Sequence, residues 1–306
     1  MSVKHFFIIN PMAGKGKAVL ELSNALTPFL GNFDITVYRT TGAGDATNFV
    51  KQTLLEGDEG TTYRFYACGG DGSLNEVVNG VMLSGKKNYA VCPYPCGSGN
   101  DFVKALGGRE KYLDIEKILT AEAQGIDVIK AGSVYAVNAV HFGLDTKVAR
   151  VMHQVRRKPI IGGRNAYTSG VVSAFFSPMK YDCTLTADGE TIHTGDFLLC
   201  TLANGKFVGG KYKCAPRSSY NDGLIEVCMV RPVSHLRFLT LVKYYEAGTH
   251  LDTPKFKDIV TYCRAKKLTL SSKEKDFAFS LDGEIVYDNN IEIEVLPGEL
   301  NLVIVE

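Results

Sequence analysis

Short apolar runs alternate with longer amphipathic stretches over residues 1–125. The runs have the length of strands, and apolar side chains recur at helical spacing between them, as Val19, Leu22 and Leu26 do. This alternation indicates β-α-β units around a largely parallel sheet. We expect an α/β domain in which Asp45 caps the second helix. The expected strands lie at residues 5–10, 33–39, 63–68 and 89–93, and the expected helices at 17–30, 45–56 and 73–83.

From residue 126 onward, strand-like runs follow one another with little helix between them. This pattern is typical of an antiparallel sandwich or barrel. The sequence therefore predicts a second, β-rich domain at residues 126–306, with helices near 166–176 and 234–247. In the latter helix the apolar side chains are Leu236, Leu239, Val242 and Tyr245. The expected strands lie at residues 126–129, 133–140, 181–187, 195–203, 224–230, 267–271, 277–281, 291–296 and 300–305.

Composition and charge narrow the class of protein. A hydrophobic share of 45% and a charged share of 22% are ordinary for a globular protein and exclude a disordered or fibrous class. The formal net charge is +1, from 34 basic and 33 acidic side chains, so no global field attracts nucleic acid. We therefore expect no nucleic-acid partner.

The eight cysteines form no Cys-X-X-Cys pair, and several lie in apolar, strand-like runs where thiols pack as small hydrophobic groups. Cys92 and Cys96 come nearest to a pair of metal ligands, but they have no second pair or histidine cluster beside them. No run reaches the roughly 18 apolar residues of a membrane-spanning helix. These features predict a cytoplasmic protein with reduced thiols and no transmembrane segment.

Three glycine-rich segments each begin where a predicted strand ends, at residues 10–16, 69–76 and 97–101. Strand ends of this kind form the edge of an open α/β sheet at which ligands bind. Glycine lets the backbone turn its amides toward a ligand, and a following helix adds partial positive charge. One such loop alone is more often a structural turn. Three such loops on one sheet edge predict a site for a nucleotide polyphosphate.

The second glycine segment contains a carboxylate at Asp71, between Gly70 and Gly72. A carboxylate repels phosphate unless a magnesium ion bridges the two or the carboxylate binds a ribose hydroxyl. The first segment matches neither the GxxxxGK[ST] phosphate loop, because Lys15 has the wrong spacing, nor the dinucleotide GxGxxG pattern. Asp71 therefore predicts metal or sugar chemistry beside the phosphates.

Two Asp-Gly turns later in the chain have alternative interpretations. Asp282 and Glu284 follow an alternating apolar run, which is the ordinary hairpin signal. Either carboxylate could also act as a general base that removes the proton of an acceptor hydroxyl. Asp222 lies in an Asn-Asp-Gly segment, which as a pattern is more often a turn than an oxygen-ligand site for a hard cation.

At these residues the chain resembles the diacylglycerol kinase catalytic-domain family, which includes sphingosine kinases, ceramide kinases and soluble bacterial lipid kinases. The combination GGDGSLNEVVNG followed by GSGNDF is the most specific part, because GGDG alone is shared with NAD kinases. The matching segments occur in family order and cover almost the whole chain: FFIINPMAGKGKA (6–18), YACGGDGSLNEVVNGV (66–81), PCGSGNDFVKAL (95–106), GIDVIKAGSVYAVNAVHFGLD (125–145), GGKYKCAPRSSYNDGLIEV (209–227) and FSLDGE (279–284).

The resemblance implies a nucleotide-binding α/β domain like that of NAD kinase and phosphofructokinase, followed by a C-terminal β-sandwich, with ATP and Mg²⁺ as cofactors. It assigns Asp282 and Glu284 as catalytic residues, with Asp282 as the general base. Residues matching the ATP site are Asn10, Pro11, Met12, Ala13, Gly14, Thr40, Gly69, Gly70, Asp71, Gly72, Ser73, Leu74, Asn75, Glu76, Ser98, Asn100 and Asp101.

In the soluble bacterial members of the family, a second, structural magnesium ion lies on the segment that matches residues 219–224. The resemblance thus implies a metal site formed by Asp222 and the carbonyl groups of Ser219 and Leu224. The residues before Asp222 supply no acidic side chain where some relatives have one.

The implied function is ATP-dependent phosphorylation of a lipid hydroxyl, with diacylglycerol as the expected substrate and phosphatidic acid as the product. The lipid would be presented at a membrane surface, which predicts a cytoplasmic protein peripheral to the membrane. A homodimer is compatible with the family. Two other functions stay open at this stage: an NAD kinase-type enzyme, which leaves GSGNDF and LDGE unexplained, and a catalytically silent lipid-binding regulator.

Overall fold

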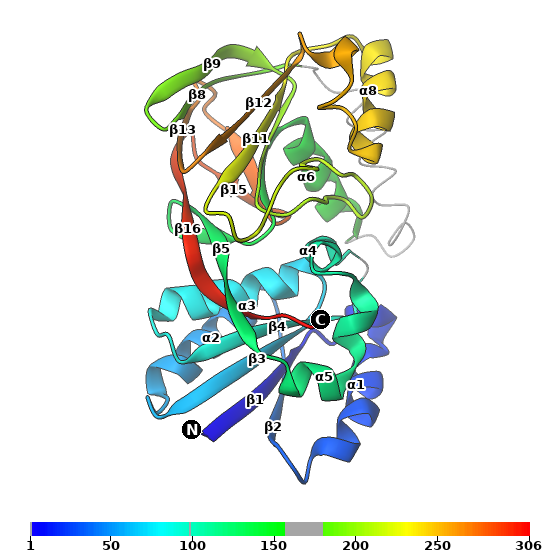
Figure 1. Cartoon of the computed structure of the whole chain (residues 1–306), viewed down its shortest axis with the longest axis vertical. Coiled ribbons are helices and arrows are strands. Elements are labelled where there is room, and N and C mark those ends of the chain that lie inside the picture. The colour runs from blue at the N-terminus through cyan, green and yellow to red at the C-terminus, as the bar shows by residue number, and fades with distance from the viewer. Residues whose placement is uncertain (1, 98, 157–179) are drawn as a thin grey trace. The chain divides into compact units, whose positions relative to one another are not determined.

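A computed structural model of the chain describes residues 2–97, 99–156 and 180–306 (Figure 1). Its internal contacts divide the chain into two compact units. The first comprises Met1–Val128 together with Pro297–Glu306, and the second comprises Ile129–Leu296. The sequence placed all of residues 126–306 in one domain, whereas the last ten residues pack with the first unit, because the final strand returns to the sheet there.

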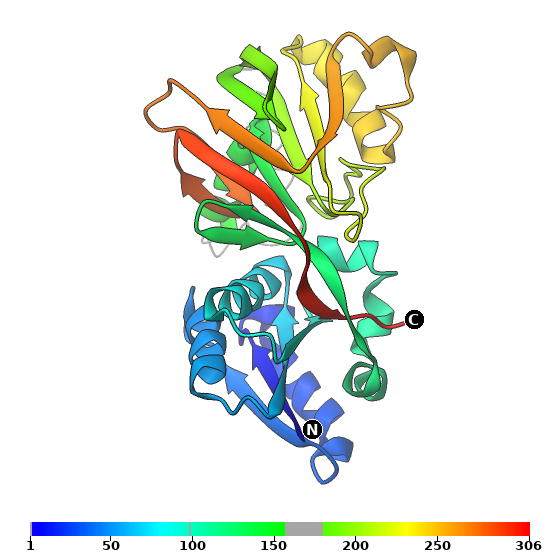
Figure 2. The same ribbon diagram turned by 60° about the vertical axis from the view of Figure 1, so that its left-hand side comes forward.

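The first unit is built on a parallel sheet with the strand order β2-β1-β3-β4. Helix α1 covers one face of this sheet, and α2 and α3 cover the other (Figures 1 and 2). The strands are β1 (Ser2–Ile9), β2 (Asp34–Arg39), β3 (Thr61–Gly69) and β4 (Tyr89–Pro95), and the helices are α1 (Ala18–Leu26), α2 (Asp45–Glu56), α3 (Asp71–Ser84), α4 (Asp101–Ala105) and α5 (Ile115–Thr120).

Helices α2 and α3 pack closely because a glycine lies at their contact. A Cβ atom at Gly80 would come within 2.6 Å of the Cβ atom of Val50, so only glycine fits this approach. The prediction that Asp45 caps α2 was wrong: Gly44 is the N-cap residue, in the left-handed conformation. Asp45 is the first helical residue, and its Oδ2 atom accepts the backbone N–H of Thr41 at 2.6 Å.

The second unit is a two-layered β-sandwich, which confirms the predicted order of an α/β domain followed by a β-sandwich domain. Its described residues form an antiparallel sheet with the order β12-β11-β10-β7-β14-β15. In a second sheet the beginning of β16 pairs with β13, β13 pairs with β8, and β8 pairs with β9. The strands are β6 (Val134–Ala136), β7 (Ala139–Gly143), β8 (Tyr181–Ala187), β9 (Glu190–Phe197), β10 (Leu199–Ala203), β11 (Ile225–Val230), β12 (Val260–Ala265), β13 (Lys267–Ser271), β14 (Ala278–Leu281) and β15 (Glu284–Tyr287).

Two strands and two helices complete the element list. Strands β5 (Ala123–Ala131) and β16 (Asn290–Val303) each run from one unit into the other along the chain. Helix α6 (Leu144–Arg156) follows β7, and α8 (His235–Ala247) follows β11. The helix predicted near residues 166–176 lies outside the described residues.

The hydrophobic core of the second unit lies between its two sheets. Phe142, Cys200 and Phe279 from one sheet meet Leu185 and Leu268 from the other, and all of these side chains are at most 2% exposed. A second cluster packs the opposite face of the six-stranded sheet against α8. Exposed and buried residues alternate along β13, as expected for a strand with one solvated face.

Several predicted boundaries differ from the structure. The run at 133–140 divides into β6 and β7, and the run at 195–203 divides between β9 and β10. The runs at 291–296 and 300–305 form one strand, β16. The sequence analysis missed α4, α5, α6, β12 and β15.

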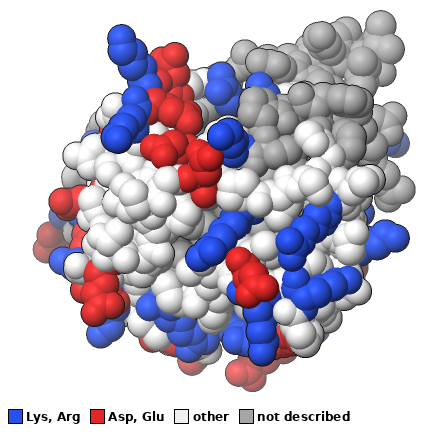
Figure 3. Space-filling model, turned by 90° about the horizontal axis from the view of Figure 1, so that it is seen from above, with Lys and Arg blue, Asp and Glu red and all other residues white. Residues whose placement is uncertain are grey.

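Charge and membrane topology add two observations. Basic and acidic side chains are interspersed over a largely uncharged surface on the face drawn in Figure 3, in keeping with the net charge of +1. None of the described helices is both long and apolar enough to cross a membrane.

All eight cysteines are free thiols, and seven of them are buried. Burial raises the pKa of Cys183 to about 12.

Two buried histidines make folding sensitive to acid. Burial lowers the pKa of His5 to about 4, and the Arg64 guanidinium contributes to the shift. Burial likewise lowers the pKa of His250 to about 4. His5 is 4% exposed and shares a 2.8 Å hydrogen bond with the Tyr66 hydroxyl. Both rings are therefore neutral in the folded protein, although both would ionise near pH 6.5 in the unfolded chain.

We expect the free energy of unfolding to fall as the pH is lowered from 6.5 to 5, because the unfolded state then binds protons that the folded state excludes. Each histidine should contribute a loss of about 1.5 kcal/mol over this window. Urea denaturation at the two pH values measures the loss. The His250→Asn variant should lose correspondingly less, and an unchanged pH dependence in that variant would contradict this assignment.

Candidate active site

The three glycine-rich loops converge at the carboxyl ends of β1, β3 and β4. The Asn10 N–H donates to the Cys68 carbonyl at 3.1 Å, which joins the first loop to the end of β3. The Gly97 N–H donates to the Gly69 carbonyl at 2.8 Å, which joins the second loop to the third. Gly14 in the first loop faces the Cys96 carbonyl. The predicted grouping of the loops on one sheet edge is therefore observed.

Backbone packing between the second and third loops leaves no space for side chains. A Cβ atom at Gly97 would lie 2.5 Å from the Cα atom and 2.6 Å from the nitrogen of Gly70. A side chain at Gly99 would collide with Oδ2 of Asp71. A narrow hollow beside this contact is bordered by Gly69, Asp71 and Asn100 among others, and it is too small to hold a water molecule. The backbone amides of the loops and the N-terminus of α3 lie at the same sheet edge, and groups of this kind bind phosphate.

Asp71 and Asp101 bring two carboxylates to this sheet edge. Oδ1 of Asp71 accepts the backbone N–H of Asp101 at 2.6 Å. Asp101 in turn pairs with the Lys104 ammonium group at 2.6 Å. Asn100 adopts a left-handed φ of 59° and donates from Nδ2 to the Gly97 carbonyl at 2.9 Å, so it fixes the turn before α4. Hard oxygen ligands beside a phosphate-binding loop are the donor set that magnesium prefers.

Other residues predicted to surround the nucleotide have mainly structural contacts. The Asn10 side chain accepts the Met12 N–H at 2.9 Å, which shapes the first loop. Thr40 extends the pairing of β1 and β2 by donating its N–H to the Ile9 carbonyl at 3.0 Å. Glu76 accepts the Ala46 N–H at 3.2 Å and so ties α3 to the start of α2.

The remaining predicted nucleotide residues fall into three groups. Pro11, Ala13 and Gly14 lie in the first loop, and Gly72 and Ser73 lie in the first turn of α3. Leu74 and Asn75 are buried within α3, at 4% and 7% exposure. Ser98 lies outside the described residues.

The Leu-Asp-Gly-Glu segment forms the turn between β14 and β15, as the hairpin interpretation predicted. Asp282 adopts a left-handed φ of 45°. Its carboxylate accepts three backbone N–H groups, from Val137 at 2.8 Å, Asn138 at 3.0 Å and Ala139 at 2.9 Å. Asp282 therefore fixes the junction between β6 and β7. Glu284 is exposed at the start of β15, and its carboxylate has no hydrogen-bond partner among the described residues.

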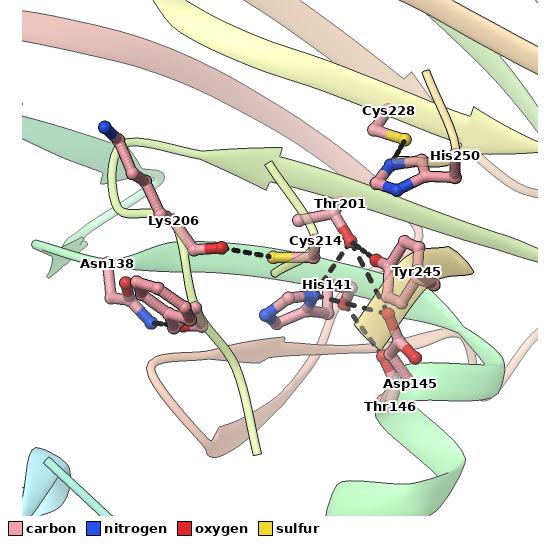
Figure 4. Close-up of polar contacts among 11 residues, drawn as sticks. Asn138, His141, Asp145, Thr146, Thr201, Lys206, Cys214, Cys228, Tyr245 and His250 are labelled. Atoms are coloured by element: carbon pink, nitrogen blue, oxygen red, sulfur yellow. Dashed lines mark hydrogen bonds and ion pairs between the residues drawn. The ribbon is translucent and has the colours of Figure 1, made fainter. Parts of the chain in front are cut away.

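A polar cluster that the sequence analysis did not identify lies on neighbouring strands (Figure 4). The strand register places Thr201 of β10 opposite His141 of β7, and His141 opposite Ser280 of β14. Thr201 Oγ1 lies 3.2 Å from His141 Nδ1 and 3.0 Å from the Tyr245 hydroxyl. Oδ2 of Asp145 lies 3.6 Å from His141 Nδ1. The four interacting side chains are His141, Asp145, Thr201 and Tyr245.

This cluster borders an apolar pocket in the second unit. The pocket has a cavity volume of about 50 Å³, and Asp145 and Tyr245 contribute to its lining. Its other lining residues are Leu144, Val148, Leu199, Val208, Tyr212, Phe238, Leu241 and Val242. The GLD segment at 143–145 was part of the family resemblance, but Asp145 interacts with Thr201 of β10 as well as with the nearby His141 of β7. The local pattern therefore could not identify the whole cluster.

The segment predicted to bind a structural metal ion does not fit a divalent cation. Oδ1 of Asp222 accepts the Leu224 N–H at 3.2 Å, and its Oδ2 lies 3.7 Å from Nη1 of Arg264. The Arg264 Nε atom pairs at 2.7 Å with Glu226, whose side chain is 1% exposed. Burial raises the pKa of Glu226, and Arg264 opposes that shift. A guanidinium group thus supplies the positive charge at Asp222, where a cation would need further oxygen ligands.

Two family models match the chain. The model described as the diacylglycerol kinase catalytic domain matches residues 4–131. The model described as the YegS C-terminal NAD kinase beta sandwich-like domain matches residues 138–304, more than half of the chain. The chain belongs to the diacylglycerol kinase catalytic-domain family. The resemblance identified from the sequence is therefore confirmed, and this member of the family is a lipid kinase.

Individual relatives agree with the family assignment. A diacylglycerol kinase from Bacillus subtilis (strain 168) is 28% identical to this family member over 296 residues, which cover 95% of this chain and 91% of the relative. The crystal structure of a diacylglycerol kinase from Bacillus anthracis has the same fold, with a TM-score of 0.72 at 20% identity. That match covers 98% of this chain and 96% of the other.

For this lipid kinase we expect the melting temperature to be the same with added Mg²⁺ and with a chelator, because Arg264 already lies beside Asp222 and pairs with Glu226. The Arg264→Ala variant should lose about 2 kcal/mol of stability, since Glu226 would be left buried without a cation. The loss is moderate because the Arg264 side chain is 43% exposed.

Differential scanning fluorimetry measures both effects, with Arg39→Ala as a control at an exposed arginine. A rise in the melting temperature of the unmodified protein on adding Mg²⁺ that the Asp222→Asn variant lacks would contradict this interpretation.

Proposed function

We propose that this lipid kinase transfers the γ-phosphoryl group of ATP to the hydroxyl group of diacylglycerol, giving phosphatidic acid and ADP. The observation that carries the proposal is the apolar pocket with a polar cluster at its border. The other unit of the same chain brings three glycine loops together at one sheet edge. The pocket suits an acyl chain, and the loops suit a nucleotide polyphosphate. We further propose that the enzyme acts from the cytoplasm on lipid at a membrane surface.

The donor side of the reaction depends on the first unit. Backbone amides of the loops would hold the phosphates, while Asp71 and Asp101 would hold the magnesium ion that accompanies ATP. That ion would neutralise charge on the phosphate oxygens. The close contact between Gly70 and Gly97 keeps the two loops at one fixed spacing, so the site is formed before the nucleotide arrives.

The acceptor side depends on the second unit. An acyl chain in the pocket would contact the aliphatic and aromatic lining residues and be removed from water. The Asp145 carboxylate, whose side chain is 24% exposed, could then accept a hydrogen bond from the polar glycerol end of the lipid. Thr201 donates to this carboxylate at 3.5 Å, and Nδ1 of His141 lies 3.6 Å from it. Tyr245 in turn shares a hydrogen bond with Thr201.

Glu284 suits the role of general base better than Asp282 does. The lone pairs of Asp282 that would take up a proton are already engaged by three backbone amides. The Glu284 carboxylate is exposed and lies two residues further along the same turn. In the proposed step Glu284 takes the hydroxyl proton, the hydroxyl oxygen bonds to the γ-phosphorus, and the bond to the ADP oxygen breaks.

The proposal is tested by incubating the purified protein with labelled ATP, Mg²⁺ and a panel of dispersed lipids, with NAD as a further acceptor. We expect labelled phosphatidic acid from diacylglycerol. The panel includes phosphatidylglycerol, undecaprenol and a sphingoid base, because these differ from diacylglycerol mainly in their tails. Labelled NADP, or no labelled product from any acceptor, would overturn the proposal.

We expect Glu284→Gln to lower kcat by about 10²–10⁴-fold while leaving ATP affinity and melting temperature unchanged, because it removes only the proton acceptor. Asp282→Asn is the matched comparison. It should lower the free energy of unfolding by about 2 kcal/mol, because an amide cannot accept all three N–H groups. The roles are reversed if Asp282→Asn abolishes turnover at normal stability and Glu284→Gln retains it.

A further inference from the structure

Helix α8 places its apolar side chains on two opposite faces. Phe238, Leu241 and Tyr245 are buried and line the pocket. Leu236 and Leu239, which the sequence analysis named among the apolar side chains of this helix, are 78% and 51% exposed. Single exposed leucines are common, but a surface helix normally presents polar side chains on its outer face. This helix therefore carries two leucines on its outer face in addition to its apolar inner face.

Basic residues surround the exposed leucines. Residues 231–258 contain five lysines and arginines, all exposed, and three acidic residues. Two of these acidic side chains are already paired, Glu246 with Lys211 at 2.9 Å and Asp252 with Arg217 at 2.5 Å. The basic residues are Arg231, Arg237, Lys243, Lys255 and Lys257. On the face drawn in Figure 3, Lys and Arg side chains gather at the lower right, where they outnumber acidic ones.

Direct contacts hold these basic residues beside α8. The Arg237 guanidinium donates to the Lys255 carbonyl at 3.2 Å. The Lys255 ammonium group donates to the Tyr244 hydroxyl at 2.8 Å and lies 4.0 Å from the centroid of its ring. The Arg231 N–H donates to the Ile259 carbonyl at 2.8 Å, which brings the end of β11 alongside. These exposed leucines and basic residues on and beside α8 are here called the α8 patch: Arg231, Leu236, Arg237, Leu239, Lys243, Lys255 and Lys257.

We propose that the α8 patch docks onto a membrane surface that contains anionic lipids. Leu236 and Leu239 would enter the boundary between headgroups and acyl chains, and the basic side chains would contact the anionic headgroups. This proposal rests on the proposed function, because a lipid kinase has to draw its substrate from a bilayer. It adds which surface faces the bilayer, and it explains why one helix is apolar on both faces: the inner face lines the pocket while the outer face contacts the membrane.

Sedimentation with vesicles tests the proposal. The full chain should bind vesicles of phosphatidylcholine with phosphatidylglycerol, and bind more weakly to phosphatidylcholine alone or at high salt. The double variant Leu236→Ser, Leu239→Ser should bind the anionic vesicles about tenfold more weakly. Leu20→Ser is the matched control, because Leu20 is 67% exposed on α1 in the first unit. Lys243→Glu with Lys257→Glu should remove the preference for anionic vesicles.

A second measurement separates docking from catalysis. The double leucine variant should phosphorylate a water-soluble, short-chain diacylglycerol at the unmodified rate, because neither leucine lines the pocket, while its rate on vesicle-embedded diacylglycerol falls. Unaltered vesicle binding by this variant overturns the docking proposal and leaves the proposed function standing. An equal loss in Leu20→Ser, or a change from dimer to monomer in the double variant, also overturns it. Failure of the unmodified enzyme on short-chain diacylglycerol instead removes the proposed function.

Discussion

The approach of Gly70 to Gly97 is the constraint on which the nucleotide end of this protein depends. Any side chain at Gly97 would overlap the backbone of the neighbouring loop, so the two loops can share one sheet edge only as bare backbone. The hydrogen bond from the Gly97 N–H to the Gly69 carbonyl then fixes their separation. Asp71 and Asp101 acquire their relative positions from this contact, because each begins the helix that follows its loop.

The sequence was most informative where structure is determined locally. The first four strands and first three helices were predicted to within a few residues, because each has its own apolar periodicity and its own glycine or turn signal. Helix α2 was predicted with its observed bounds, Asp45–Glu56. The glycine loops could be grouped in advance because parallel strands place their carboxyl ends on one edge. Family membership was also readable, since its motifs are contiguous in the chain.

Predictions failed where a distant residue decides the local structure. The run at 133–140 is uniformly strand-like, yet it divides because Asp282 draws the amides of Val137 and Asn138 to its carboxylate. The run at 195–203 divides at Leu198, where the chain passes from one sheet of the sandwich to the other. Conversely, Pro297 and Gly298 do not end β16, because Asp127 accepts the Gly298 N–H at 3.0 Å. The cluster around Asp145 escaped detection for the same reason.

Strand β16 has a consequence for how the chain is made. Its last residues pair with β4 at Leu302 and Val91, and the Tyr112 hydroxyl reaches the Val303 carbonyl, so the sheet of the first unit gains a strand from the end of the chain. A ribosome therefore releases the whole second unit before the first unit can acquire its final strand. Until then the edge of β4 has unpaired backbone groups in a nascent chain, which makes it a surface that chaperones would need to protect.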